Sequence, residues 1–168
     1  MVKYKEITGD LIAIALKGNF DVIAHGCNCM SKMGAGLAVQ MNRSFDCSSF
    51  EMENWGPNIH KLGCIDYETF VLGKNGHWNI RNGGNIEHYP IFYVVNAYTQ
   101  YYPSVRTKPL DYEALTLCMR KINHTFKGKR IGLPKIGAGL AGGEWLRIRT
   151  IIELELKDCD TTVVIYKK

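Results

Sequence analysis

Apolar positions along the chain follow two patterns, short continuous or alternating runs typical of strands and spacings of three to four residues typical of helices. The strand pattern occurs at residues 2–7, 20–24, 63–72, 91–95, 130–133 and 162–166, and the helix pattern at residues 11–16, 36–42, 109–126 and 144–156. Strands and helices alternate for most of this order, as they do in α/β proteins. We therefore expect a single domain over residues 1–168, with three layers, α/β/α, and a central mixed sheet whose early strands are antiparallel.

Turn signals separate several of these segments. Residues 74–77 contain an Asn-Gly pair typical of β-hairpin turns, and residues 82–85 contain a Gly-Gly turn. Residues 43–57 give no assignment. Residues 96–102 carry three tyrosines and several amides directly after a predicted strand. This segment fits a loop that lines a pocket and fits equally a packed aromatic turn.

The pentapeptide Gly-Ala-Gly-Leu-Ala occurs twice, at residues 34–38 and at residues 137–141. Each copy follows a strand-like run and precedes a helical one. The N-terminus of a helix leaves backbone N–H groups without partners, and glycines beside it let a phosphate approach them closely. Because two such loops are present, the sequence predicts a site for a pyrophosphate.

Asp10 stands between the first predicted strand and the first predicted helix. Asp is a preferred N-cap residue, because its side-chain oxygen accepts from an N–H of the first turn. It also lies at the carboxyl end of a strand, where α/β proteins place ligand contacts. The two roles can coexist, since a carboxylate has two oxygens.

Composition narrows the class of protein. A formal net charge of +5 and a pI of about 8.9 are mildly basic, which fits an anionic ligand without requiring nucleic acid. No segment has the roughly 20 consecutive apolar residues of a membrane span, and no signal-peptide core is present, so we expect a cytoplasmic protein. The cysteines lack Cys-x-x-Cys spacing, so no metal site is predicted, and Cys27 and Cys29 fit packing residues better than a metal or nucleophile role.

Taken together, these motifs resemble the macro domain, the ADP-ribose-binding fold. The resemblance covers nearly the whole chain and rests on motifs at residues 7–11, 25–36, 133–140, 143–145 and 164–166, which occur in the family's order. It is strongest for the small stand-alone branch that includes the ADP-ribose 1″-phosphate phosphatases and the terminal ADP-ribose hydrolases that act on proteins or DNA.

The resemblance implies roles for individual residues. Asp10 would accept a hydrogen bond from the adenine amino group, Tyr166 would pack near the adenine, and Asn28 would contact the distal ribose with His25 beside it. The two glycine loops would hold the pyrophosphate. The residues implied in substrate binding are Asp10, Leu11, Met33, Gly34, Ala35, Gly36, Thr99, Gly137, Ala138, Gly139, Leu140 and Tyr166.

The chain also departs from its relatives. The de-ADP-ribosylating relatives use a lysine just after the central strand and, in one subgroup, an acidic residue directly after the second Gly-Leu. This chain has Thr99-Gln100 near the first place and Ala141 at the second, and Lys135 precedes the second loop instead. The resemblance therefore carries no lysine mechanism to this chain.

Our leading hypothesis is an enzyme, an ADP-ribose 1″-phosphate phosphatase that works without a cofactor, with Asn28 orienting the substrate and His25 transferring a proton. His25 also fits a buried structural histidine, and Glu144 fits either a base or a favourable charge at a helix N-terminus. The alternatives are a hydrolase that removes mono-ADP-ribose from protein or DNA, and a non-catalytic binder of ADP-ribose or a related nucleotide. We expect a monomer with a small-molecule ligand and no membrane partner, and nucleic acid only as an ADP-ribosylated substrate.

Overall fold

The computed structural model describes residues 4–72, 78–80, 91–104 and 106–167. In chain order the elements are β1 (Tyr4–Thr8), α1 (Leu11–Leu16), β2 (Val22–Asn28), α2 (Gly36–Phe45), the 3-10 helices η1 (Cys47–Ser49), η2 (Glu51–Trp55) and η3 (Ile59–Lys61), β3 (Ile65–Leu72), β4 (Trp78–Ile80), β5 (Ile91–Gln100), α3 (Tyr112–Thr125), β6 (Arg130–Leu133), α4 (Trp145–Glu155) and β7 (Asp160–Ile165).

The strands form one seven-stranded sheet in the order β1-β7-β6-β2-β5-β3-β4. Neighbours from β1 to β5 along this order are parallel, whereas β3 is antiparallel to both β5 and β4. The predicted mixed sheet is confirmed. The prediction that the early strands are antiparallel is wrong for β1, which pairs parallel with β7, and for β2, which pairs parallel with β5 and β6. Crossover connections between these strands return the chain in the same direction.

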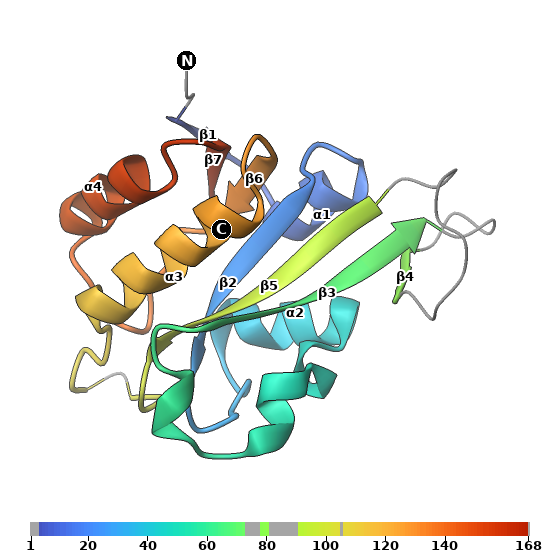
Figure 1. Ribbon diagram of the computed structural model, residues 1–168. Coiled ribbons are helices and arrows are strands. Elements are labelled where there is room, and N and C mark those ends of the chain that lie inside the picture. Colours follow the sequence, from blue (N-terminus) through green and yellow to red (C-terminus); the bar gives the residue numbers. More distant parts are fainter. Residues whose placement is uncertain (1–3, 73–77, 81–90, 105, 168) are drawn as a thin grey trace.

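Helices cover both faces of the sheet, which confirms the three-layer α/β/α arrangement (Figure 1). One core lies between the sheet and α3 and α4, and includes Leu115, Met119 and Ile148. The other lies between the sheet and α1 and α2, and includes Leu11, Met41 and Phe45. The two cores hold the central strands β2 and β5 between them, so the carboxyl ends of these strands are fixed from both sides.

Aspartates begin two of the helices. The Oδ1 atom of Asp10 accepts from the N–H of Ala13 at 2.9 Å at the start of α1. The Oδ1 atom of Asp111 does the same for Ala114 at the start of α3. The predicted cap at Asp10 is therefore confirmed.

Some boundaries differ from the sequence prediction. The strand predicted at residues 91–95 continues to Gln100, because residues 96–99 are buried and pair with β2 and β3. Most of the segment expected to be a loop after residue 95 is thus strand.

The predicted turns at residues 74–77 and 82–85 lie outside the described residues. None of the described helices is long and apolar enough to span a bilayer.

Candidate anion-binding site at the carboxyl ends of the strands

A cavity of about 470 Å³ opens at the carboxyl ends of β2, β5 and β6. Both glycine loops line it, as do the strand ends between them. The lining residues are 25–28, 32–38, 99–100, 103–104, 134–137 and 139–141. The structure thus brings the two pentapeptides, about 100 residues apart in the sequence, to one hollow.

Backbone N–H groups of both loops are available at this cavity. Among the described residues, no acceptor bonds the N–H groups of Met33, Gly34, Gly137, Gly139 or Leu140. The helix α2 also begins without a side-chain cap, since its N-cap residue is an alanine. Unpartnered N–H groups around a hollow form a binding site for anions.

The two loops contact each other and have fixed shapes. Gly36 has a φ of +60°, and a Cβ on it would lie 3.2 Å from Leu140 Cδ1. The second loop is closed by the Gly143 N–H, which donates to the carbonyl oxygen of Gly137 at 2.8 Å. These contacts hold the N–H groups in place before any ligand arrives.

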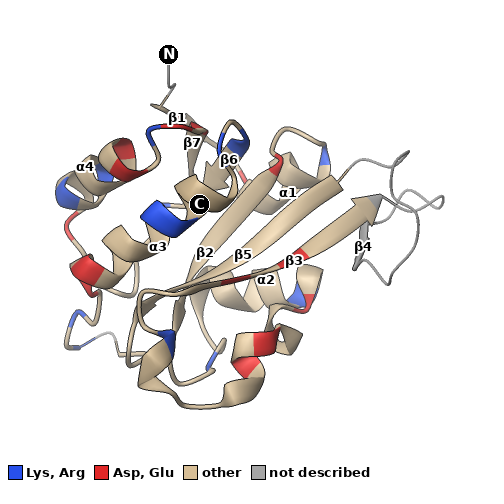
Figure 2. Cartoon of the chain, viewed as in Figure 1, with Lys and Arg blue, Asp and Glu red and all other residues tan. Residues whose placement is uncertain are grey.

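The charges at the cavity have one sign. Lys32 and Lys135 line it, and none of its lining residues within the described chain is Asp or Glu. The Lys135 Nζ atom lies 5.0 Å from the centre of the Trp145 ring, which holds this lysine at the rim. Acidic residues lie on other parts of the chain, such as Glu51 and Glu53 on η2 (Figure 2). The cavity therefore favours an anionic ligand.

Asn28 holds the first loop together. Its Oδ1 atom accepts from the N–H groups of Met30 at 3.1 Å and Lys32 at 3.2 Å, and its Nδ2 atom donates to the carbonyl oxygen of Lys32 at 2.7 Å. Both lone pairs of the amide oxygen are thus used within the loop. The side chain lines the cavity, and in this arrangement it shapes the cavity wall.

His25 points to the strand next to it. The Asn96 amide nitrogen donates to the Cys47 carbonyl oxygen at 3.0 Å, which fixes Asn96 Oδ1 as an acceptor. His25 Nε2 lies 2.7 Å from that oxygen and so carries the proton, which leaves Nδ1 as the unprotonated nitrogen. Burial lowers the pKa of His25 to about 4. At neutral pH the ring is therefore uncharged, and these contacts favour the structural interpretation of His25.

Thr99 lies at the floor of the cavity beside Gly26. Its hydroxyl is buried and has no hydrogen-bond partner among the described residues. A Cβ on Gly26 would come within 3.1 Å of that hydroxyl, so the glycine keeps the floor open there. A buried hydroxyl without a partner costs free energy, and a ligand oxygen could supply the missing bond after a small rotation of the side chain.

Other predicted site residues lie elsewhere. Asp10 lines a second hollow between α1 and α2, together with Arg43, whereas Leu11 is buried in the core beneath it. Tyr166 is 65% exposed after β7, and neither Tyr166 nor Ala138 is among the residues that line the cavity. The N–H of Ala138 donates to the carbonyl oxygen of Lys135 instead.

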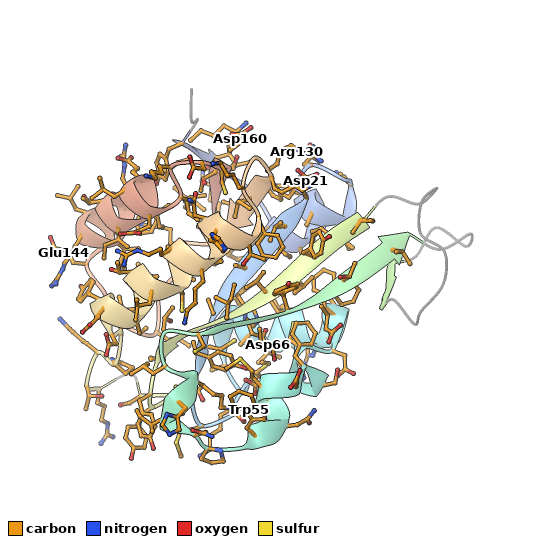
Figure 3. All side chains as sticks on the ribbon, viewed as in Figure 1. Asp21, Trp55, Asp66, Arg130, Glu144 and Asp160 are labelled. Atoms are coloured by element: carbon orange, nitrogen blue, oxygen red, sulfur yellow. The ribbon has the colours of Figure 1, made fainter. Side chains whose placement is uncertain are left out.

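Glu144 is the N-cap residue of α4 (Figure 3), and it does not line the cavity. Its side chain makes no capping hydrogen bond, and its backbone N–H donates to the Tyr112 hydroxyl at 2.8 Å. This placement favours the helix-terminus interpretation over the interpretation as a base.

The cysteines behave as packing residues. Cys27 and Cys29 are buried and unpaired, and burial raises the pKa of the Cys27 thiol well above its ordinary value and that of Cys29 to about 11. A thiol of raised pKa is a poor nucleophile. The described residues contain no group of three or more His, Cys, Asp or Glu side chains arranged to hold a metal ion.

Sequence reasoning missed part of the site. It did not single out Lys32, which precedes the first glycine loop, and it set Lys135 aside because it is not at the family's lysine position. Pro103 and Ser104 also line the cavity. Their only sequence signal was their place after the predicted central strand.

No protein-family model matches the chain. The chain is 31% identical to an uncharacterised 17.5 kDa protein in the tk-vs intergenic region of Enterobacteria phage T4, over 98% of this chain and 96% of that protein. It is 24% identical to an ADP-ribose 1″-phosphate phosphatase of Scheffersomyces stipitis, over 91% and 94% of the two chains. Among solved structures, a macrodomain protein from Streptomyces coelicolor is 25% identical with a TM-score of 0.63, over 100% of this chain and 99% of that one.

Proposed function

The chain belongs to the macro domain family, and we propose that it binds ADP-ribose and removes the 1″-phosphate from ADP-ribose 1″-phosphate. The observation that carries the proposal is the make-up of the cavity. Unpartnered N–H groups of two glycine loops and two lysines surround it, and no carboxylate lines it within the described chain. These groups suit a pyrophosphate with a further phosphate at its end.

The absence of a carboxylate from the described cavity lining favours phosphate release over cleavage of a glycosidic bond. The relatives that cleave this bond use a lysine just after the central strand and, in one subgroup, an acidic residue after the second Gly-Leu, and this chain has Thr99-Gln100 and Ala141 at these places. Phosphoryl transfer passes through a loose transition state, for which positioning and charge stabilisation are sufficient. A cavity with cations and N–H donors supplies both.

In the proposed reaction, the oxygen of a water molecule attacks the phosphorus of the 1″-phosphate. The bond between that phosphorus and the ester oxygen breaks, that oxygen takes one proton of the water and stays on ADP-ribose as its hydroxyl group, and the other proton leaves with inorganic phosphate. Lys32 and Lys135 would stabilise charge on the phosphoryl oxygens. Asn28 would keep the first loop in the shape that grips the pyrophosphate, with His25 neutral beneath it.

The second hollow suits the adenine end of the ligand. Asp10 uses Oδ1 for its helix cap, which leaves Oδ2 for the adenine amino group. Tyr166 is exposed at the end of β7, where it is free to pack against a base.

The test is release of inorganic phosphate from ADP-ribose 1″-phosphate by the purified protein. Lys32→Met and Lys135→Met should each lower kcat/KM by about tenfold or more, because each removes a charge that faces the phosphoryl group. Lys157→Met removes an exposed lysine that does not line the cavity and should leave the rate unchanged.

Calorimetry with ADP-ribose separates the alternatives. Binding without phosphate release would reject the phosphatase. Incubation with mono-ADP-ribosylated protein and DNA would then distinguish the hydrolase from the non-catalytic binder. Release of ADP-ribose from either conjugate would identify a hydrolase. Binding without any turnover would identify a non-catalytic module, and no binding would reject the proposal as a whole.

A further inference from the structure

Lys61, the last residue of η3, has a fully buried side chain, at 0% exposure. Its Nζ atom donates to Ser31 Oγ at 2.5 Å and lies 5.2 Å from the centre of the Tyr98 ring. Among the described residues, no carboxylate lies within ion-pair distance of it. A buried ammonium without a partner ion carries a large desolvation cost, so its place in the fold calls for a reason.

The nearest polar groups make no direct ion pair with this charge. Glu53 is also buried, but its Oε1 atom accepts from the Tyr98 hydroxyl at 2.6 Å. Ser31 connects Lys61 of η3 with Glu53 of η2. It receives the hydrogen bond of Lys61 and donates its own hydroxyl to the backbone carbonyl of Glu53 at 2.9 Å. Lys61 therefore acts on its surroundings mainly through Ser31.

Ser31 lies within the loop that forms one wall of the cavity. Its φ of 55° is in the left-handed region, which a residue other than glycine occupies only at a cost. The following residue, Lys32, lines the cavity, and its backbone N–H and carbonyl are both bonded to Asn28. The loop is thus held by Asn28 on one side and by the Lys61–Ser31 contact on the other. Figure 3 places Trp55, at the end of η2, at this same end of the sheet.

The charge of Lys61 is offset at the cavity wall by that of Glu53. Burial raises the pKa of Cys27, a lining residue, Glu53 raises it further, and the opposing effect of Lys61 is smaller than that of Glu53. A buried charge is screened by salt much less than an exposed one. Lys61 therefore acts on the loop through its hydrogen bond and adds no net positive potential at Cys27.

We propose that Lys61 is a positioning residue for anion binding, which acts through Ser31 to hold Lys32 and the N–H groups of the first glycine loop toward the cavity. The inference rests on the proposed function for the identity of the ligand, ADP-ribose. The arrangement of the loop itself can be measured without any ligand.

The experiment compares Lys61→Met, Ser31→Ala and the double variant with the wild type. Methionine fills a similar space without the charge, and replacing a buried ion by an apolar residue is often tolerated. Lys121→Met is the matched control, because Lys121 does not line the cavity. Its Nζ atom donates at 2.8 Å to the carbonyl oxygen of Gly63, which is two residues after Lys61. Thermal unfolding of each variant establishes that it is folded.

Lys61→Met and Ser31→Ala should each weaken ADP-ribose binding by about tenfold, and the double variant should be no weaker than the weaker single one, because both remove the same contact. In ligand-free ¹⁵N spectra, the amide signals of Met30 and Lys32 should move in both variants, while those of Gly137 and Gly139 should not. Lys121→Met should leave affinity and signals unchanged.

Additive losses, or unmoved signals of Met30 and Lys32, would overturn the inference. Wild-type protein that binds no ADP-ribose would reject the proposed function instead, and the amide spectra would still decide whether Lys61 sets the shape of the loop. Ser31→Ala keeps the test decisive if Lys61→Met does not fold.

Discussion

At the scale of single residues, the polar side chains nearest the cavity mostly bond to the protein itself. Asn28 uses its amide to hold residues 30–32, and His25 bonds to Asn96. The groups left for a ligand are backbone N–H groups, two exposed lysines and the Thr99 hydroxyl. Binding strength in such a site depends on how well the loops are held before the ligand arrives.

The buried His25 makes stability depend on pH. Its pKa is about 4 in the folded protein and 6.5 ordinarily, so the unfolded chain binds more protons between these values. The stability that depends on neutral His25 should therefore be fully present above pH 6.5. The free energy of unfolding should fall as the pH drops toward 4, by about 2 kcal/mol between pH 7 and pH 5. Urea unfolding at these pH values should reveal this loss, and His25→Gln should remove it.

His124→Gln is the control for this prediction, because His124 is exposed on α3. It should keep the pH dependence of the wild type. An equal loss in wild type and His25→Gln would mean that other groups cause it.

Asn28→Ala should lower both stability and affinity. It deletes three hydrogen bonds of the first loop, so we expect a loss of about 1–3 kcal/mol in the free energy of unfolding and about tenfold in ADP-ribose affinity. Asn28→Asp keeps the oxygen that accepts two of the three bonds and should retain more stability than Asn28→Ala. Urea unfolding and calorimetry measure the two effects. Equal stability of both variants would contradict the role of that oxygen.

Residue-level prediction from the sequence succeeded where a local pattern carried the information. The cap at Asp10 follows from its place before a helix. The environment of His25 could not be predicted, because its partner Asn96 is 71 residues away in the sequence and only the sheet pairing brings the two together. The buried Lys61 was missed for a related reason, since η3 has no apolar periodicity and follows a stretch that gave no assignment.

At the scale of elements, the two glycine loops work because strands β2 and β6 are neighbours in the sheet. Their repeated pentapeptide was visible in the sequence, and the pairing that joins them in one cavity follows from the parallel order of an α/β sheet. The extension of β5 to Gln100 was not visible, because tyrosines and amides are buried there against both neighbouring strands. Burial by neighbours overrode the local polar pattern.

Substitution in the second glycine loop should reveal its packing. Gly137 has a φ of +76°, and a Cβ on it would lie 2.8 Å from Leu110 Cδ1. Gly128 has a φ of +78° with nothing within 4 Å of its Cβ position. Gly128→Ala should cost about 1 kcal/mol from the backbone alone, and Gly137→Ala about 1–3 kcal/mol more from the clash.

Urea unfolding of the two alanine variants measures this difference. Phosphate release or ADP-ribose binding should fall only in Gly137→Ala. Equal destabilisation would mean that Leu110 moves aside freely, and the loop would then be softer than its contacts indicate.

At the scale of the whole molecule, charge is distributed over the surface with both signs interspersed, and the net charge is +5 (Figure 2). The field at the cavity therefore comes mainly from its own lysines. Because Lys32 and Lys135 are exposed, salt should screen their attraction for a phosphate. The Kd for ADP-ribose should rise several-fold between roughly 50 mM and 500 mM NaCl, because the Debye length shortens over this range.

The salt dependence can be assigned by variants. The double variant Lys32→Met with Lys135→Met should bind more weakly and with a flatter dependence on NaCl, as measured by calorimetry. Lys157→Met should keep the wild-type slope. A slope unchanged in the double variant would place the relevant charge elsewhere on the molecule.

The position of β1 in the sheet has a consequence for how the protein is made. β1 lies at the edge of the described sheet, and its neighbour there is β7, at residues 160–165 (Figure 1). The ribosome synthesises β1 before β7, so β1 must wait for more than 150 further residues before it can pair. A chain released before residue 160 would lack that partner, and the residues of β1 would be open to proteases.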